Sequence, residues 1–201
     1  MLKVESINTF YGKAQIIFDL SFEVSAGEVA VLLGRNGAGK TTTFKSIMGL
    51  VPAARGTITF NTENILGWPP HKICGLGLGY VPEDRRIFSK LTIMENLEVG
   101  KQPSRGGEQQ MLAIARTLMG NPELIILDEP SEGLAPVILE QLAKTIVKLK
   151  AEGVAVLMAD QNLNFAKTVC DWAYIIQQGR ICHESAINEL SRETCEKYLS
   201  V

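Results

Sequence analysis

The 201-residue chain has almost no net charge, no long apolar run and no paired cysteine motif. A net charge of −2 and a pI near 5.8 give no overall basic signal of the kind that nucleic-acid-binding domains carry. No run approaches the ~18 apolar residues that a membrane-spanning helix needs, and the first residues include no apolar stretch of a signal peptide. We therefore expect a soluble, intracellular protein that binds no nucleic acid but can dock on a membrane protein.

The four cysteines are not spaced as a zinc site. No two of them form a C-x-x-C pair, and only two histidines are available to join them. We expect reduced cysteines with a structural role rather than a metal site or a disulfide. The hydrophobic content of 46% is enough for one substantial core with a small appended subdomain.

A glycine-rich segment fits the phosphate-binding pattern G-x-x-x-x-G-K-[ST]. An apolar run at 29–33 predicts a buried strand before it, and the spacing of apolar residues at 41–50 predicts a helix after it. A strand that breaks into glycines and restarts as a helix points backbone N–H groups at an anion. An ordinary glycine-rich turn is the alternative, which these flanking elements make weak. The segment consists of Gly34, Arg35, Asn36, Gly37, Ala38, Gly39, Lys40 and Thr41.

Two side chains of this segment add specific chemistry. Lys40 supplies a full positive charge for the phosphates, and the Thr41 hydroxyl is suited to holding Mg²⁺. The glycines let the backbone approach the phosphates closely, and we expect some of them to adopt positive φ.

A second motif is an apolar strand that ends in two carboxylates. Residues 124–127 are apolar, and Asp128 and Glu129 follow them. Because the carboxyl ends of parallel strands open on the ligand crevice, both acids should face the nucleotide. Asp128 is suited to holding Mg²⁺ or its water shell, and Glu129 to polarising the attacking water. The alternative is that the two acids merely cap the next helix.

The remaining pattern predicts an α/β fold. The segments 2–10 and 16–24 alternate as strands around a turn at Tyr11-Gly12, and 56–60 is another short strand. Strands then alternate with helices, which predicts a parallel sheet, whereas the N-terminal strands look antiparallel. We expect helices near 71–74 and at 92–99, 108–119, 137–149 and 164–169 and in a short C-terminal tail, and strands at 124–127, 154–158, 172–177 and 180–183.

A third motif, Gly106-Gly107-Glu108, opens the predicted helix at 108–119. Two glycines at a helix start expose backbone N–H groups to an anion. Taken alone, an ordinary helix N-terminus explains it. The informative feature is the order along the chain: glycine loop, Gly-Gly-Glu helix, acidic strand end.

This order resembles the ATP-binding subunits of ABC transporters, and in particular the importer ATPases for branched-chain amino acids. The resemblance covers essentially the whole chain and is carried most clearly by residues 33–43, 80–88 and 127–136. It implies a P-loop NTPase with a mixed, mainly parallel core sheet, an N-terminal antiparallel β subdomain, and a helical subdomain that is short or missing here. It also implies one domain over 1–201, with a β and P-loop core at 1–82, a reduced helical arm at about 83–105, and the signature helix and C-terminal α/β part at 106–201.

The resemblance also implies roles for individual residues. Tyr11 matches the aromatic that stacks on adenine, although a buried core tyrosine is an alternative. Glu83 lies in the Q-loop region, where it would join Thr41 and Asp128 around the metal. Gln161 stands at the switch position, where it would assist Glu129 by donating a hydrogen bond to the γ-phosphate.

Other segments would contact the nucleotide or the partner. The glycine-rich segment matches the family's Walker A loop, and Thr42, which directly follows it, would add to its nucleotide contacts. Gly106, Gly107 and Glu108 would contact the nucleotide held by a partner subunit. The segment 131–134 matches the D-loop, which crosses to that partner.

The function implied is Mg²⁺-dependent ATP hydrolysis that drives uptake of branched-chain amino acids or related solutes. The partners would be a second ATPase subunit, identical or related, an integral membrane permease and, indirectly, a periplasmic solute-binding protein. The site of action would be the cytoplasmic side of the inner membrane. A nucleotide-gated module that hydrolyses ATP poorly is the alternative. A relative acting on DNA or ribosomes is disfavoured because no coiled-coil insertion or tandem cassette is present, and a GTPase because no Asn-Lys-x-Asp motif is present.

One departure from the family pattern concerns the helical subdomain. Only 22 residues separate Glu83 from Gly106, and Arg105 stands where the signature normally has serine. Either the subdomain is truly short, or a stretch is missing between two otherwise intact parts, which we favour because both flanks match the family. The second explanation predicts a Cα–Cα step between Lys101 and Gly107 far longer than the ~3.8 Å of a peptide link, with Arg105 to Gly106 as the expected place.

Overall fold

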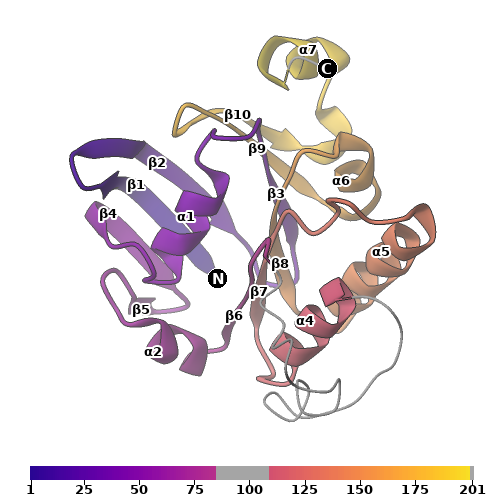
Figure 1. Cartoon of the computed structure of the whole chain (residues 1–201), viewed down its shortest axis with the longest axis horizontal. Coiled ribbons are helices and arrows are strands. Elements are labelled where there is room, and N and C mark those ends of the chain that lie inside the picture. The colour runs from indigo at the N-terminus through magenta and orange to yellow at the C-terminus, as the bar shows by residue number, and fades with distance from the viewer. Residues whose placement is uncertain (85–108, 200–201) are drawn as a thin grey trace.

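The protein contains two β-sheets that differ in strand direction (Figure 1). The structure is a computed structural model that describes residues 1–84 and 109–199. The first sheet is antiparallel, with the strand order β2-β1-β4-β5. Its strands are β1 (Leu2–Tyr11), β2 (Ala14–Val24), β4 (Ala53–Phe60) and β5 (Glu63–Asn64).

The second sheet has the strand order β10-β9-β3-β8-β7-β6. All neighbouring strands in it are parallel except β9 and β10, which form an antiparallel hairpin. The predicted α/β fold, with a mixed core sheet and an N-terminal antiparallel subdomain, is therefore confirmed. The strands are β3 (Val29–Leu33), β6 (Leu78–Val81), β7 (Leu124–Asp128), β8 (Ala155–Asp160), β9 (Trp172–Gln177) and β10 (Arg180–Ala186).

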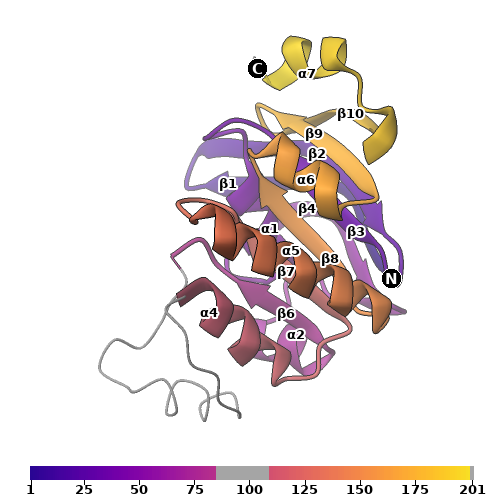
Figure 2. The ribbon, with the colours of Figure 1, turned by 90° about the vertical axis from the view of Figure 1, so that its right-hand side faces the viewer.

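Helices cover both faces of the core sheet. Helix α1 lies between the two sheets, while α4, α5 and α6 line the opposite face, as Figure 2 shows. Alternate residues of β3 pack into two different cores, with Ala30 and Leu32 toward α1 and Val29 and Val31 toward the outer helices. Burial on both faces explains why the parallel strands are continuously apolar. The helices are α1 (Lys40–Ile47), α2 (Pro70–Gly75), α4 (Gln109–Leu118), α5 (Pro136–Ala151), α6 (Leu163–Val169), α7 (Arg192–Leu199) and the 3₁₀ turn η1 (Ile187–Glu189).

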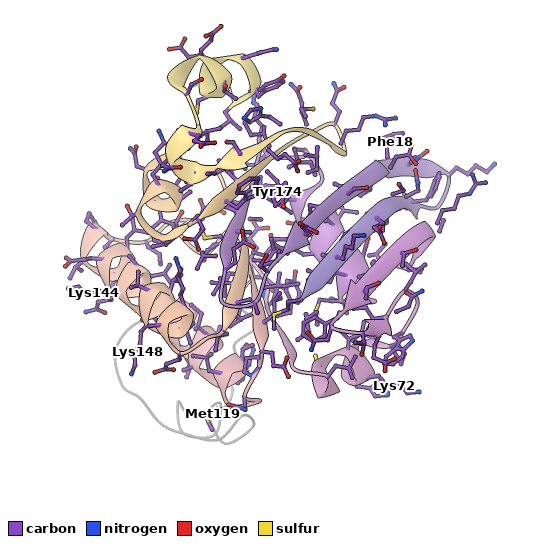
Figure 3. All side chains as sticks on the ribbon, turned by 180° about the vertical axis from the view of Figure 1, so that it is seen from behind. Phe18, Lys72, Met119, Lys144, Lys148 and Tyr174 are labelled. Atoms are coloured by element: carbon purple, nitrogen blue, oxygen red, sulfur yellow. The ribbon has the colours of Figure 1, made fainter. Side chains whose placement is uncertain are left out.

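The outer surface of α5 is charged. Lys144 and Lys148 extend from it away from the sheet (Figure 3), and each pairs with a glutamate four residues away. Such exposed pairs contribute a few tenths of a kcal/mol each, about 0.3–0.5. Among the described residues, no helix is long and apolar enough to cross a membrane.

The turn between β9 and β10 joins the two sheets to the glycine loop. The Gly179 N–H donates to the Ala38 carbonyl at 2.8 Å, and the Gly179 carbonyl accepts from the Phe18 N–H at 2.9 Å. A Cβ at Gly179 would lie 1.9 Å from the Ile16 carbonyl oxygen, so only glycine fits there. Near the start of β9, the Tyr174 hydroxyl donates to the carbonyl of Glu23 on β2 at 2.8 Å. The loop is thus positioned by both sheets.

Two strands were not expected from the sequence, β5 and β6. In β6, Gly79 weakens the strand signal, yet a Cβ there would lie 2.6 Å from the Thr117 side chain of α4. Gly79 therefore allows α4 to pack closely on β6, and the same glycine weakens the strand pattern in the sequence. Strand β8 also extends to Asp160, two residues past its predicted end. All four cysteines are free: Cys170 and Cys195 are buried, whereas Cys74 and Cys182 are exposed.

Several predictions lie outside the described residues. These are the helix at 92–99, the segment 106–108 and the chain geometry between 101 and 107. The division of the domain into residues 1–82, about 83–105 and 106–201 also stays a prediction.

Candidate functional site

The predicted site residues gather at the carboxyl edge of the core sheet. The glycine loop follows β3, the two acids end β7, and Gln161 follows β8. The pairing register aligns these ends, because Leu33 lies opposite Asp160 and Asp128 lies opposite Ala159. Three segments that are far apart in the sequence therefore meet at one edge.

The glycine loop has the conformation expected of an anion cradle. Gly37 and Gly39 have φ values of 79° and 113°, a region that non-glycine residues rarely adopt. A Cβ at Gly34 would lie 2.5 Å from the Ile176 carbonyl oxygen, so close packing as well as backbone conformation requires glycine. Helix α1 begins at Lys40, directly after Gly39, and its N-terminus adds free N–H groups to the same concavity.

Lys40 is buried at the centre of the site. Its Nζ donates to the carbonyls of Gly34 and Arg35 at 2.7 and 3.2 Å and lies 2.9 Å from Glu129 Oε1. The two charged side chains are only 4% and 6% exposed. Removing either partner of such a pair would leave an uncompensated buried charge. A bound phosphate would therefore compete with Glu129 for the Lys40 ammonium.

Glu129 has a backbone conformation that is unusual for a residue with a side chain. Its φ is 48°, and its N–H donates to the Ala159 carbonyl at 2.9 Å. A non-glycine residue in this region is strained by about 1–3 kcal/mol and persists only where its surroundings enforce it. The result is that the carboxylate turns from the end of β7 toward Lys40.

Asp128 is buried between two hydroxyl groups. The Thr41 hydroxyl donates to Oδ1 at 3.0 Å, and the Tyr80 hydroxyl donates to Oδ2 at 3.1 Å. Burial raises the pKa of Asp128 to about 6, the two hydrogen bonds act against that rise, and the charges of Glu83 and Glu129 add to it. The carboxyl group thus holds a proton more readily than a surface aspartate does.

The oxygen atoms around Asp128 fit the ligand preference of Mg²⁺. A cavity of about 270 Å³ is lined by described residues that include Thr41, Glu83 and Asp128. Mg²⁺ binds through one or two carboxylates, retained waters and substrate phosphates, rather than through a closed protein cage. The predicted metal residues Thr41, Glu83 and Asp128 therefore line one cavity.

Gln161 connects the glycine loop to Glu129. Its Nε2 donates to Asn36 Oδ1 at 2.7 Å and lies 3.4 Å from Glu129 Oε2. The amide can offer a hydrogen bond at this point but cannot carry a charge. The predicted catalytic pair is thus adjacent.

Tyr11 lies at the end of β1 and is 47% exposed, which rules out the alternative of a buried core tyrosine. Its role in stacking on adenine stays a prediction, as do the roles of Gly106, Gly107 and Glu108, which lie outside the described residues.

The sequence did not reveal two groups that shape the site. The sequence analysis did not identify Tyr80 as a hydrogen-bond partner of Asp128, because it did not predict β6. The Tyr80 hydroxyl extends from the end of that strand. Asp160 directly precedes Gln161 in the sequence, and its carboxylate is only 1% exposed, a burial that the sequence analysis did not predict. The one available signal was its position at the end of an apolar strand.

Comparison with known proteins matches the sequence of this chain to one family. The model of the ABC transporter family matches residues 17–106 and 98–132. The chain is 40% identical to the high-affinity branched-chain amino acid transport ATP-binding protein BraG of Pseudomonas aeruginosa, over 90% of this chain and 91% of that protein. It is 34% identical to the lipopolysaccharide export system ATP-binding protein LptB of Haemophilus influenzae, over 90% of this chain and 88% of that protein.

A solved structure supports the same fold. The ADP conformation of an ATP-binding cassette of an ABC transporter superposes with a TM-score of 0.84 and 23% identity, covering 100% of this chain and 94% of that one.

The alignment with BraG is longer than the part of this chain that it covers. The match to BraG spans 211 positions, but 90% of this chain is about 181 residues, so about 30 positions of the relative have no counterpart here. The family model matches in two pieces that overlap at residues 98–106.

Proposed function

The chain belongs to the ABC transporter ATP-binding family, and on this premise we propose that it powers the uptake of branched-chain amino acids or related solutes through a membrane permease. Members of this family hydrolyse ATP as transport subunits. We propose further that two such subunits close over two nucleotides, and that closure drives the permease. The proposed place of action is the cytoplasmic face of the inner membrane.

The observation that carries the proposal for the site is the contact between Lys40 and Glu129 beside Gln161. Glu129 lies within hydrogen-bonding range of both Lys40, the proposed phosphate-binding cation, and Gln161, the proposed γ-phosphate sensor. Thr41 and Asp128 form a second contact next to them. A structural ion pair would need none of the flanking amide and hydroxyl groups.

In the proposed mechanism, the loop N–H groups and Lys40 bind the β- and γ-phosphates of ATP. When the phosphates take over the Lys40 ammonium, Glu129 loses its ion-pair partner and becomes available to the attacking water. Glu129 accepts the proton of that water, and Gln161 holds the γ-phosphate in line. Mg²⁺, held by Thr41 and Asp128 with Glu83 nearby, would neutralise charge on the phosphates.

The transported solute is inferred from similarity alone. BraG is named for branched-chain amino acid transport and LptB for lipopolysaccharide export, and the chain resembles BraG more. Isolation of the chain with its neighbouring subunits tests the proposal. A permease and solute-binding protein that bind leucine support it, whereas partners of a lipopolysaccharide exporter would contradict it.

A nucleotide-gated module with poor turnover is the second candidate, favoured by Arg105 at the signature serine position. Steady-state ATP hydrolysis measured with the permease separates the two candidates. Turnover that depends on Mg²⁺ and is lost in Glu129→Gln supports the ATPase. Tight ATP binding with equally low turnover in the parent and the variant supports the module.

A further inference from the structure

Asp160 is a buried carboxylate that the mechanism above does not use. It is 1% exposed and accepts four hydrogen bonds from three neighbours. Its Oδ1 accepts from the Ser131 hydroxyl at 2.7 Å, from the Gln161 N–H at 2.7 Å and from the Asn162 N–H at 2.8 Å. Its Oδ2 accepts from the Ser131 N–H at 3.3 Å. Every donor comes from a segment that follows a core strand.

These bonds join the two segments that carry the proposed catalytic side chains. Ser131 lies two residues after Glu129, in a turn closed by the Glu132 N–H donating to the Glu129 carbonyl at 3.2 Å. Gln161 directly follows Asp160, and Asn162 caps α6 by accepting from the Phe165 N–H at 3.0 Å. One carboxylate therefore holds both segments against each other.

We propose that Asp160 is a positioning residue for ATP hydrolysis, which sets the Gln161 amide against Glu129 through its link to Ser131. The inference rests on the proposed roles of Glu129 and Gln161. The distance from Gln161 Nε2 to Glu129 Oε2 is 3.4 Å, so a shift of either segment by less than 1 Å makes or breaks that contact. A movement of the Ser131 turn therefore reaches Gln161 through Asp160.

The chemistry of the site requires an acceptor-only group. Three donors converge on Oδ1, and the Ser131 N–H faces Oδ2. An asparagine at position 160 would place its NH₂ group against the Ser131 N–H, a donor facing a donor in a buried site. Burial raises the pKa of Asp160 as well, and its hydrogen bonds act against that rise.

The first test measures turnover of the purified full chain in three single variants, one double variant and one control. Ser131→Ala removes the link, Ser131→Thr keeps the hydroxyl, and Asp160→Asn introduces the donor conflict. We expect kcat to fall about tenfold in Ser131→Ala and further in Asp160→Asn, with KM for ATP changing less than twofold, because positioning affects the transition state. Ser131→Thr should retain most of the kcat, and the double variant Ser131→Ala/Asp160→Asn should lose no more than Asp160→Asn alone.

The matched control is Asp171→Asn. Asp171 also binds a backbone N–H, that of Val29 at 3.0 Å, but at the opposite edge of the sheet. Asp171→Asn should lower the melting temperature and leave kcat unchanged. If Asp160→Asn and Asp171→Asn lose kcat in proportion to melting temperature, Asp160 only anchors the fold and the proposal is wrong.

The second test needs no turnover. Amide hydrogen exchange in the nucleotide-free chain should rise at Gln161 and Asn162 in Ser131→Ala and stay at the parent level in Asp171→Asn. Unchanged exchange together with unchanged kcat would refute the link. If instead Glu129→Gln hydrolyses ATP at the parent rate, the proposed function of the site fails, while the exchange result still decides whether Asp160 couples the two segments.

Discussion

Two lysine–carboxylate pairs stand at opposite edges of the same sheet and differ in burial. Lys40 and Glu129 at the carboxyl edge are 4% and 6% exposed, whereas Lys150 and Asp171 at the amino edge are 40% and 39% exposed. Asp171 also accepts from the N–H of Val29, where β3 begins. The chemistry is the same, but the surroundings are not.

The comparison distinguishes the exposed pair at the amino edge, which fits a structural role, from the buried pair at the carboxyl edge, which we propose responds to a bound phosphate. An exposed pair contributes about 0–1 kcal/mol and requires no special backbone. Burying two charges costs several kcal/mol in lost hydration, and here it comes with a strained φ at Glu129. Such a cost is expected where a phosphate can replace one partner of the pair.

Lys40→Ala should have the largest effect on ATP binding. We expect ATP affinity to fall at least about a hundredfold, because the phosphates lose their buried cation and meet an unpaired Glu129. Lys150→Ala is the matched control and should change affinity less than twofold. Nucleotide titration by fluorescence measures the ATP affinity of both variants. Near-parental affinity and turnover in Lys40→Ala would show that the glycine loop is not the nucleotide site.

Glu129→Gln should separate binding from chemistry. The amide keeps the shape of the side chain but cannot accept the proton of the attacking water, so kcat should fall about 10²–10⁴-fold with ATP still bound. We expect a closed dimer to accumulate with ATP, visible by size-exclusion chromatography. The control is Glu140→Gln in the exposed pair with Lys144. Parental hydrolysis in Glu129→Gln would exclude Glu129 from the mechanism.

Asp128 should make stability depend on pH. Its folded pKa of about 6 lies above the ordinary value of 3.8, so the folded protein keeps a proton that the unfolded chain loses between about pH 4 and 6. This contribution to stability is present below pH 4 and is lost as the pH rises past 6, by up to about 3 kcal/mol.

Asp128→Asn should therefore gain stability relative to the parent as the pH rises from 4 to 7. Denaturant unfolding of the protein without nucleotide or Mg²⁺ measures the difference. A difference between variant and parent that is equal at both pH values would show that Asp128 ionises normally.

Tyr11→Ala should have the smallest effect. Loss of one stacking contact weakens ATP binding by roughly 1 kcal/mol, which is about fivefold in affinity. Phe10→Ala is the control, because Phe10 is similarly exposed but lies on the other face of β1 by strand alternation. Equal affinities for the two variants would mean that Tyr11 does not contact the adenine.

Much of the fold and the site was predictable because the relevant signals are local. The glycine loop needs positive φ at Gly37 and Gly39, and strand β7 needs an unbroken apolar run before Asp128, so both appear directly in the residue pattern. Strand β6 was missed because its glycine serves contact with α4, a partner remote in the sequence. Local propensity and tertiary packing conflict at that position, and packing prevails.

The sequence by itself determined which groups are available: a glycine loop that we propose binds phosphate, two acids at a strand end, and a glutamine at the proposed switch position. Only the tertiary structure decided their pairing. The register of the parallel sheet brings Gln161 to Asn36 and Lys40 to Glu129, and it places Asp160 where one carboxylate can hold the Ser131 turn. Distances and burial of this kind depend on contacts between residues about 30 to 125 positions apart, which no local pattern of residues encodes.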